Sequence, residues 1–233
     1  MTLSTSVADD RLGQYYRRTA AIAERLDKSL PFDKVMDTLQ TIHDGKLTPF
    51  ASGLRGRFIR TMPILIGGVQ KDVLIEQIKA VRELGTYAER MMRHKLFTTL
   101  AEPEQTILID LCPADLGFTD PNNLPTTTEL FDPKRLAEWS AANLDGYVIA
   151  LCPAEVGPHL AIQYKDQPKG EVLWVAMERI PGSGGSPSVF DVGRDGGGGR
   201  LWLGGGWAGP GDRWGLDDRF VFRLRKVSSA LAA

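Results

Sequence analysis

Residues 194–226 have the sequence RDGGGGRLWLGGGWAGPGDRWGLDDRFVFRLRK, and they decide how the chain is organised. Three tryptophans and ten glycines lie in this stretch, which ends in an apolar, β-rich run from Phe220 to Leu224. Burying one tryptophan removes about 150–250 Å² from water, whereas ordering one glycine costs about 0.5–1 kcal/mol more than ordering an alanine. Because disordered segments usually lack aromatic residues, the stretch predicts ordered loops held by tryptophan anchors, with at least one ring in the core. We interpret the preceding chain as the scaffold that presents these loops.

The composition of the 233-residue chain is that of an ordinary globular protein, and it narrows the classes of partner. The hydrophobic fraction is 42%, the charged fraction is 24% and the net charge is -1, so no basic excess predicts a nucleic-acid partner. No apolar run approaches the roughly 20 residues of a membrane-spanning helix, and residues 1–18 lack the apolar core of a secretory signal. We therefore expect a cytoplasmic protein with neither a nucleic-acid nor a membrane partner.

The first hundred residues are expected to form a helical N-terminal region. Apolar residues at helical spacing predict helices at 9–29, 32–44, 70–84 and 87–97. Between the second and third of these, Met62–Ile66 is a short apolar run around Pro63, which predicts an edge strand or a buried connector. The boundary of this region is expected within residues 98–106. One interpretation of its role is the assembly of a homo-oligomer through the N-terminal helices.

Residues 106–228 are expected to complete an α+β fold, as a mixed α/β domain in which antiparallel strands follow a helix. Asp132 and Pro133 predict the start of a helix that ends near Asn143 and turns Trp139 inward, because Asp is favoured at the N-cap and Pro at the first helical position. β-rich runs bounded by turn signals predict the strands. These strands are expected at residues 106–112, 147–151, 171–180, 188–192, 200–203, 206–207 and 219–225.

A repeated octet occurs at two of these strand ends, LCPADLGF at residues 111–118 and LCPAEVGP at residues 151–158. The copies agree in Leu, Cys, Pro, Ala, an acidic residue, an aliphatic residue and Gly. One pair of octets does not make a repeat array, so it indicates either an internal duplication or two strand ends that need the same turn. We interpret the acidic residues, Asp115 and Glu155, as caps of the helical turns that follow them.

The cysteines of the octets suggest an alternative function, a hydrolase or metal-dependent enzyme built around Cys152, Glu155 and His159, or around Asp217–Asp218. The chain has no CxxC or HxxxH pattern, however, and its two cysteines are 40 residues apart. That is not the ligand spacing of a zinc site, and two cysteines do not make a disulfide framework. We therefore predict that Cys112 and Cys152 are buried structural thiols that are not bonded to each other, and we expect no metal and no cofactor.

The order of motifs from residue 106 to 226 resembles the C-type-lectin fold. A helix with the inward Trp139 leads to DGYVIALCPAEVG, then to strands, to RLWLGGGWAG and to a final FVFRLRK. More narrowly, it is similar to the formylglycine-generating-enzyme-like branch, in which a G-x-R-L-P-T-E-A-E-W segment is followed by R-G-G-S-W and a terminal G-F-R-L strand. The corresponding stretches here are Tyr147 to Val156, Arg200 to Trp207 and Phe220 to Leu224.

The chain departs from that branch at several points. Cys152 stands in the expected threonine region, and Trp202 interrupts the glycine segment. The paired catalytic cysteines of the oxidase have no counterpart, so the resemblance does not imply its activity. The stretch LCPAEVGP, together with QYKDQPKGE, also resembles uncharacterised proteins of candidate-phylum bacteria.

This branch includes the variable proteins targeted by diversity-generating retroelements, which display a diversified C-terminal patch that binds ligand. Their template codons are mostly AAC or AAT, and randomising the adenines gives Gly, Asp, Arg, Leu, Pro or Ala but not Trp, Lys, Glu, Gln or Met. From Leu203 to Arg219, every residue except the two tryptophans belongs to the reachable set. The resemblance thus implies a diversified surface in which the tryptophans are fixed scaffold positions.

We expect a non-enzymatic module that binds an as yet unknown protein or small ligand through this C-terminal surface, since adaptable paratopes combine polar, glycine-bearing surfaces with aromatic anchors. The expected ligand-binding residues are Trp202, Gly204, Gly205, Gly206, Trp207, Ala208, Gly209, Asp212, Arg213, Trp214, Gly215, Leu216, Asp217 and Asp218. Their small and charged members are predicted to lie on one exposed face framed by the three tryptophans. A long hairpin loop without a ligand and a structural assembly protein are the other interpretations.

Overall fold

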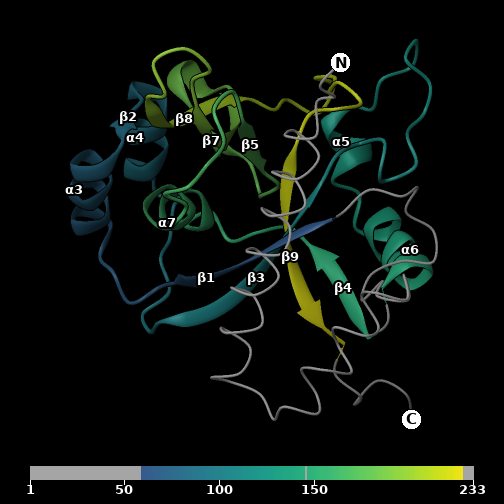
Figure 1. Cartoon of the computed structure of the whole chain (residues 1–233), viewed down its shortest axis with the longest axis horizontal. Coiled ribbons are helices and arrows are strands. Elements are labelled where there is room, and N and C mark those ends of the chain that lie inside the picture. Colours follow the sequence, from purple (N-terminus) through teal and green to yellow (C-terminus); the bar gives the residue numbers. More distant parts are fainter. Residues whose placement is uncertain (1–58, 145, 228–233) are drawn as a thin grey trace, which may run out of the picture. The chain divides into compact units, whose positions relative to one another are not determined.

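The computed structural model describes residues 59–144 and 146–227 (Figure 1). Every described residue belongs to one compact unit. The helices predicted at 9–29 and 32–44 lie outside the described residues. None of the helices described has both the length and the apolar character that crossing a bilayer requires.

The described residues of this unit are organised around a nine-stranded mixed sheet (Figure 1). In chain order its strands are β1 (Arg60–Ile66), β2 (Glu83–Leu84), β3 (Glu104–Leu111), β4 (Tyr147–Ala150), β5 (Val172–Val175), β6 (Ile180–Pro181), β7 (Pro187–Arg194), β8 (Leu201–Trp207) and β9 (Phe220–Lys226). In space the order is β1-β3-β9-β5-β7-β8-β2, with β4 beside β9 and β6 beside β7. Helices and sheet together confirm an α+β fold. The β5–β9 and β2–β8 pairs are parallel, so the sheet is not antiparallel throughout.

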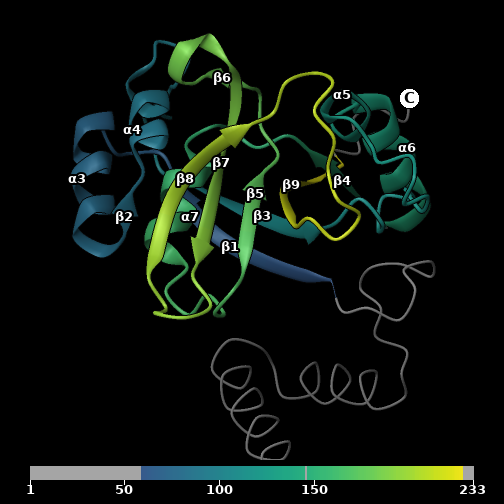
Figure 2. The ribbon, with the colours of Figure 1, turned by 90° about the horizontal axis from the view of Figure 1, so that it is seen from above.

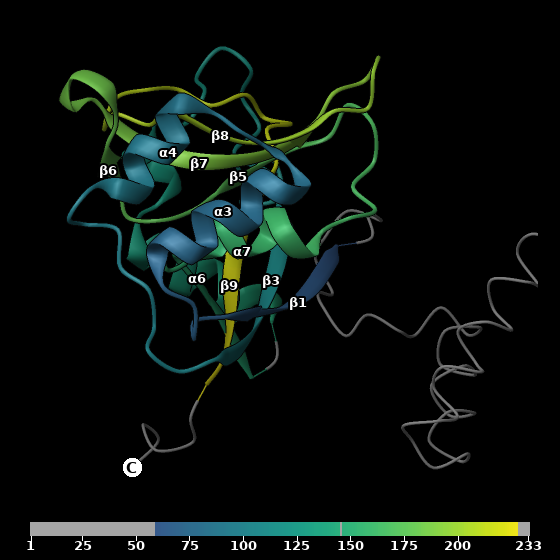
Figure 3. The ribbon, with the colours of Figure 1, turned by 90° about the vertical axis from the view of Figure 1, so that its left-hand side faces the viewer.

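Helices cover the two faces of the sheet unequally. They are α3 (Lys71–Val81), α4 (Thr86–Arg93), α5 (Thr127–Leu130), α6 (Pro133–Asn143) and α7 (Val156–Gln163), with a 3₁₀ turn η1 at Ser183–Gly185. Figures 2 and 3 show α3, α4 and α7 on one side of the sheet, with α5 and α6 near β4 and β9. On the α7 side, a Cβ on Gly157 would lie 2.8 Å from Cβ of Phe190 in β7. On the other side, the ring of Phe131 meets those of Phe220 and Phe222 in β9 edge-to-face.

Local capping signals set the two helices that precede β4. Thr126 and Glu129 form a capping box at the start of α5. Asp132 caps α6 by accepting hydrogen bonds from two backbone amides of its first turn, where Pro133 is also placed. The helix predicted from these residues is confirmed, and its Trp139 faces inward with 9% exposure.

The segment before residue 98 belongs to the same sheet as the later strands. β1 pairs with β3 along its whole length, and β2 pairs with β8. Residues 59–97 contain two helices and two strands, because both strands complete the sheet that the rest of the chain forms.

β1 is the edge strand that the run Met62–Ile66 predicts. Pro63 has no N–H to offer along this edge. The side-chain amide of Gln163 accepts from the backbone N–H of Leu65 and donates to its carbonyl. Both features protect the edge from pairing with another strand.

The helix predicted at 70–84 ends at Val81, three residues early. The next residue, Arg82, is 6% exposed, and its guanidinium donates hydrogen bonds to the backbone carbonyls of Ala161 and Tyr164. These long-range bonds turn the chain out of the helix and into β2.

The strand predicted at 171–180 and the pair predicted at 200–203 and 206–207 also have different limits in the structure. The first ends at Val175, because Met177 bridges to Cys152 and the chain pairs again only in β6. The two short strands predicted on either side of the glycines are instead one strand, β8, which runs through these glycines. Side chains of other elements lie directly against the glycines of β8, so larger residues would not fit at these positions of the strand.

Candidate functional site

β5, β7 and β8 have one face that none of the described helices covers, and Figure 2 looks onto it. Side chains alternate between the two faces of a strand, and Phe190, which meets α7, marks the covered face. On the open face, Trp174 of β5, Asp191 of β7 and Gly204 of β8 lie side by side. We call the residues of this face the tryptophan face: Trp174, Asp191, Gly193, Trp202, Gly204 and Gly206.

The two indole rings of the tryptophan face lie directly over glycines. A Cβ on Gly193 would be 2.0 Å from Cζ2 of Trp202, and a Cβ on Gly206 would be 2.5 Å from Cζ3 of Trp174. Any other residue at either position would displace the ring above it. Both tryptophans are half-buried, so each keeps part of its ring in contact with solvent.

Asp191 is a nearly buried carboxyl, 8% exposed, with two different oxygens. Oδ1 accepts a hydrogen bond of 2.7 Å from Nε1 of Trp202. Oδ2 accepts none from the described residues and is not sealed from solvent. Burial raises the pKa of Asp191, and the hydrogen bond from Trp202 opposes that shift. A Cβ on Gly204 would lie 2.5 Å from Oδ2, so glycine at this position keeps the oxygen open.

Gly205, Trp207 and Ala208 do not lie on the tryptophan face. Gly205 points towards α4, where a Cβ would be 2.7 Å from Sδ of Met91. Trp207 is 71% exposed, but the alternation of the strand places it on the side of Gly205. Ala208 is fully buried. The prediction of a single exposed face is wrong for these residues, because successive residues of a strand point to opposite sides.

Trp214 anchors the loop of residues 208–219 and is 6% exposed. Its Nε1 donates a 2.9 Å hydrogen bond to Oγ1 of Thr127. Its ring meets those of Trp174 and Phe220 edge-to-face, at centroid distances of 5.0 and 4.9 Å. The prediction that at least one tryptophan of this stretch is core is confirmed, and the same ring supports one wall of the tryptophan face.

The remaining predicted ligand-binding residues lie in this loop and differ in exposure. Asp212, Arg213 and Asp217 are exposed, whereas Gly209, Gly215, Leu216 and Asp218 are half-buried. The carboxylates of Asp212 and Asp218 accept 2.7 Å hydrogen bonds from the backbone amides of Gly209 and Gly215. These two carboxylates close tight turns, so the freely exposed part of the loop is smaller than the sequence indicates.

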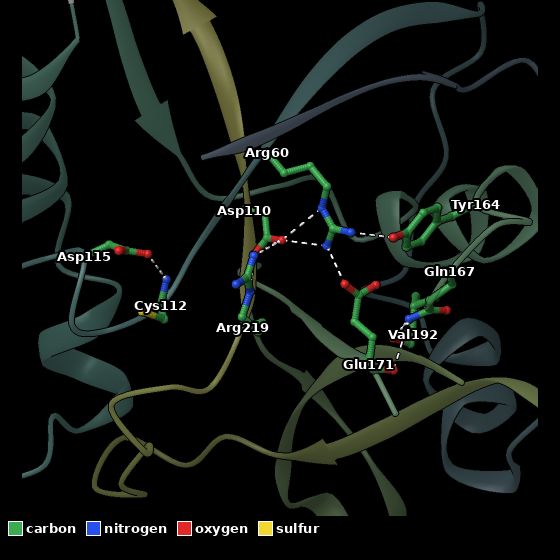
Figure 4. Close-up of polar contacts among 9 residues, drawn as sticks. All are labelled: Arg60, Asp110, Cys112, Asp115, Tyr164, Gln167, Glu171, Val192 and Arg219. Carbon is green, nitrogen blue, oxygen red and sulfur yellow. Dashed lines mark hydrogen bonds and ion pairs between the residues drawn. The ribbon is translucent and has the colours of Figure 1, made fainter. Parts of the chain in front are cut away.

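A second polar cluster lies on the helix-covered face, where β1, β3, β5 and β9 meet (Figure 4). The fully buried Asp110 accepts a 2.6 Å hydrogen bond from Nη2 of Arg60 and a 2.9 Å bond from Nε of Arg219. Arg60 also pairs with Glu171 at 2.8 Å and donates a 2.5 Å bond to the hydroxyl of Tyr164. We call these five residues the arginine cluster.

Charges within the arginine cluster balance, since two guanidinium groups face two carboxylates. Burial raises the pKa of Tyr164 to about 12, an effect that Arg60 opposes and Glu171 reinforces. The phenol is therefore neutral near pH 7. Oε2 of Glu171 is buried and accepts no hydrogen bond from a described residue. The cluster cross-links strands that are far apart in the sequence, and its charged groups are paired with one another.

The residues of the hydrolase alternative hold backbone segments together. The carboxylate of Glu155, 1% exposed, accepts hydrogen bonds from the amides of Gly67 at 3.1 Å and Leu100 at 3.0 Å. Nε2 of His159 accepts from the same Gly67 amide at 3.2 Å. The thiol of Cys152 donates to a backbone carbonyl of β9, and burial raises its pKa. A thiol with a raised pKa is a poor nucleophile.

The two octets fold differently despite their similar sequences. Asp115 accepts a 2.8 Å hydrogen bond from the amide of Cys112 and closes a turn, whereas Glu155 makes no side-chain cap for α7. Cys112 and Cys152 are both buried, as predicted, and no disulfide joins them. Within residues 59–144 and 146–227, no three His, Cys, Asp or Glu side chains are grouped so that they could hold a metal ion.

Comparison of the chain with protein-family models, with curated proteins and with solved structures finds no match. Of the features described above, the tryptophan face combines partly exposed aromatic rings with an open carboxylate oxygen.

The sequence analysis missed three residues of this face, Trp174, Asp191 and Gly193. An acidic residue inside the apolar strand at 188–192 was a usable signal for Asp191, because carboxylates are seldom buried without a partner. Trp174 and Gly193 carried no such signal, since their positions beside Trp202 depend on strand register.

Proposed function

We propose that the protein is a binding module whose ligand contacts the tryptophan face and the exposed loop residues beside it. The observation that supports this proposal is Asp191, a nearly buried carboxyl with one open oxygen, next to two half-buried indole rings. Tryptophan supplies large contact area at a low cost in conformational entropy. Glycines beneath the rings and beside the carboxyl let these three side chains lie directly against the sheet.

We also infer the finer fold, a C-type-lectin-like domain of the formylglycine-generating-enzyme-like branch, from the motifs. In support, the matched stretches fall in sequence order on β4 and the start of α7, on β8, and on β9. A diversified surface is supported by the division within the loop. Asp212, Arg213 and Asp217, whose residue types randomised codons can reach, are exposed, while Trp214 is anchored in the core.

The alternative of a hydrolase or metal-dependent enzyme has less support. Glu155 and His159 are occupied with backbone amides, and the Cys152 thiol is buried. The alternative of a structural assembly protein depends on N-terminal helices that lie outside the described residues, so the observations above do not favour it.

Selection from a random peptide library displayed on phage tests the binding function. Clones selected on the wild-type protein are measured again on the double variant Asp191→Asn with Trp202→Ala. The control is Tyr87→Ala, which removes a 51% exposed ring from α4 on the covered face. We expect most clones to lose at least about tenfold in affinity, roughly 1.4 kcal/mol, on the double variant and none on the control. Clones that bind all three proteins equally would contradict the proposal.

A further inference from the structure

We propose that Asp191, Trp174 and Trp202 form a subsite for a basic side chain, the guanidinium of an arginine or the ammonium of a lysine, presented by a peptide ligand. This inference rests on the proposed binding function and names the chemistry of its central contact.

The register of the sheet places Asp191 between the two indole rings. On one side along β7, the ring of Trp202 covers Gly193, two residues further on. On the other side, the ring of Trp174 reaches Gly206, which is the cross-strand partner of Val189. Across the strand, the carboxylate lies against Gly204, where a Cβ would be 2.5 Å from Oδ2. Asp191 therefore lies between two aromatic rings, and all three side chains lie against glycines of the sheet.

Within the part of the chain that the structure describes, no lysine or arginine provides a counter-charge for this carboxylate. Its contacts in the described residues are the neutral indole of Trp202 and its uncharged strand neighbours, and neither a lysine nor an arginine contributes to its electrostatics. Asp110, which is also buried, is bonded to two arginines. A buried carboxylate is stable only when a charge or several hydrogen bonds compensate it, so Oδ2 of Asp191 is suited to an external cation.

A cationic group also suits the two indole rings beside Asp191. Lysine and arginine are attracted to the face of an indole, by about 0.5–2 kcal/mol depending on desolvation. One open oxygen is enough for a single charge-assisted hydrogen bond from either an ammonium or a guanidinium. The adjoining loop, residues 208–218, has three aspartates and one arginine, a local charge of −2 that disfavours an anionic ligand.

The experiment is a titration of the ¹⁵N-labelled full-length protein with Nα-acetyl-arginine amide and Nα-acetyl-lysine amide, followed through the indole N–H resonances of its five tryptophans. The resonance of Trp202 is assigned from its loss in Trp202→Phe. We expect this resonance to shift saturably with both compounds, with a Kd of about 1–10 mM. Nα-acetyl-citrulline amide, which has nearly the same shape without the charge, is the matched ligand control and should produce less than about one tenth of the shift at equal concentration.

Two variants locate the subsite. Asp191→Asn keeps an acceptor for Trp202 but removes the charge, and Gly204→Ala keeps the charge but crowds Oδ2; each should weaken arginine amide binding at least tenfold. Glu76→Gln makes the same carboxylate-to-amide change on α3, at an exposed site on the covered face, and should leave binding unchanged. The unshifted indole resonances, with that of Trp214 as the core marker, show that each variant is folded.

Three results would each overturn the inference: equal shifts with citrulline amide, retained arginine binding in Asp191→Asn, or no shift of Trp202 in the wild-type protein. The phage selection separates these failures from failure of the binding function. Clones that depend on the tryptophan face but lack basic residues would leave the proposed function standing and refute the cationic subsite. If no clone depends on the tryptophan face and arginine amide causes no shift, both proposals fail.

Discussion

Asp110 and Asp191 are two buried aspartates on opposite faces of the same sheet, and their hydrogen-bond donors differ in charge. Asp110 accepts hydrogen bonds from Arg60 and Arg219, whereas Asp191 accepts one from the neutral indole of Trp202. A buried carboxylate between two guanidinium groups holds strands together, while one without a counter-charge lowers stability. The difference indicates that the arginine cluster serves the fold, and it is the basis of our proposal that Asp191 contacts a second molecule.

The largest expected effect tests whether the tryptophan face is built on the core. Trp214→Ala removes the ring that supports Trp174 and should lower the free energy of unfolding by about 3–5 kcal/mol. Thermal melting of the variant measures this loss. A melting temperature equal to that of the wild type would mean that Trp214 is not an anchor and that the wall formed by Trp174 is not supported from behind.

The next largest expected effect tests whether Asp110 and its arginine partners stabilise the fold. Asp110→Asn leaves Arg60 and Arg219 facing a neutral group, and should cost about 3 kcal/mol, the lower end for breaking a buried pair, because the two arginine side chains are 29% and 32% exposed. For a domain of this size, that loss appears as a fall in Tm of about 6–12 °C. Chemical denaturation provides a second measurement. A variant as stable as the wild type would remove the contrast between the two aspartates.

Asp191→Asn should instead raise the free energy of unfolding at neutral pH. Because burial raises the pKa of Asp191, the folded state binds the proton more tightly than the unfolded chain, whose aspartates have a pKa of about 3.9. The free energy of unfolding therefore falls as pH rises from the unfolded pKa through the folded pKa, and the cost persists at neutral pH. Asparagine does not ionise, so the variant should melt higher at pH 7, by about 2–4 °C for each kcal/mol relieved.

The pH dependence provides the control for that prediction. The difference in Tm between Asp191→Asn and the wild type should shrink as the pH is lowered below the unfolded pKa, where the wild-type carboxyl is protonated in both states. A variant that melts lower than the wild type at pH 7 would show that the carboxylate stabilises the fold, and Asp191 would then belong with Asp110.

The smallest expected effect concerns the loop beside the tryptophan face. Asp212→Asn, Arg213→Ser and Asp217→Ser change exposed residues and should each shift stability by no more than about 0.5 kcal/mol. Adding Leu216→Ser, at a half-buried position, completes a quadruple variant whose loss of stability should stay well below that of Trp214→Ala. Thermal melting beside Trp214→Ala measures the difference. A quadruple variant that unfolds at room temperature would identify the loop as core and reverse our division of this segment into anchor and surface.

Local signals were sufficient to predict part of this structure. Asp132 and Pro133 fixed the start of α6, the proline of β1 indicated an edge strand, and the aromatic character of residues 194–226 indicated a core tryptophan. The breaks after Val81 and Val175 could not be predicted locally, because each depends on a partner distant in sequence. The candidate site could not be predicted for the same reason, because the contact between Asp191 and Trp202 depends on strand register.

The close approach of side chains to Gly193, Gly204 and Gly206 has a consequence for mutational mapping. Alanine scanning is designed to reveal a binding surface by deleting side chains, but at these positions alanine adds one where an indole ring or a carboxylate already lies. Truncating the exposed Asp217 should change binding very little, whereas adding one methyl group at Gly193, Gly204 or Gly206 should weaken binding strongly. A scan of this protein would therefore report the proposed binding surface most strongly at residues that have no side chain to delete.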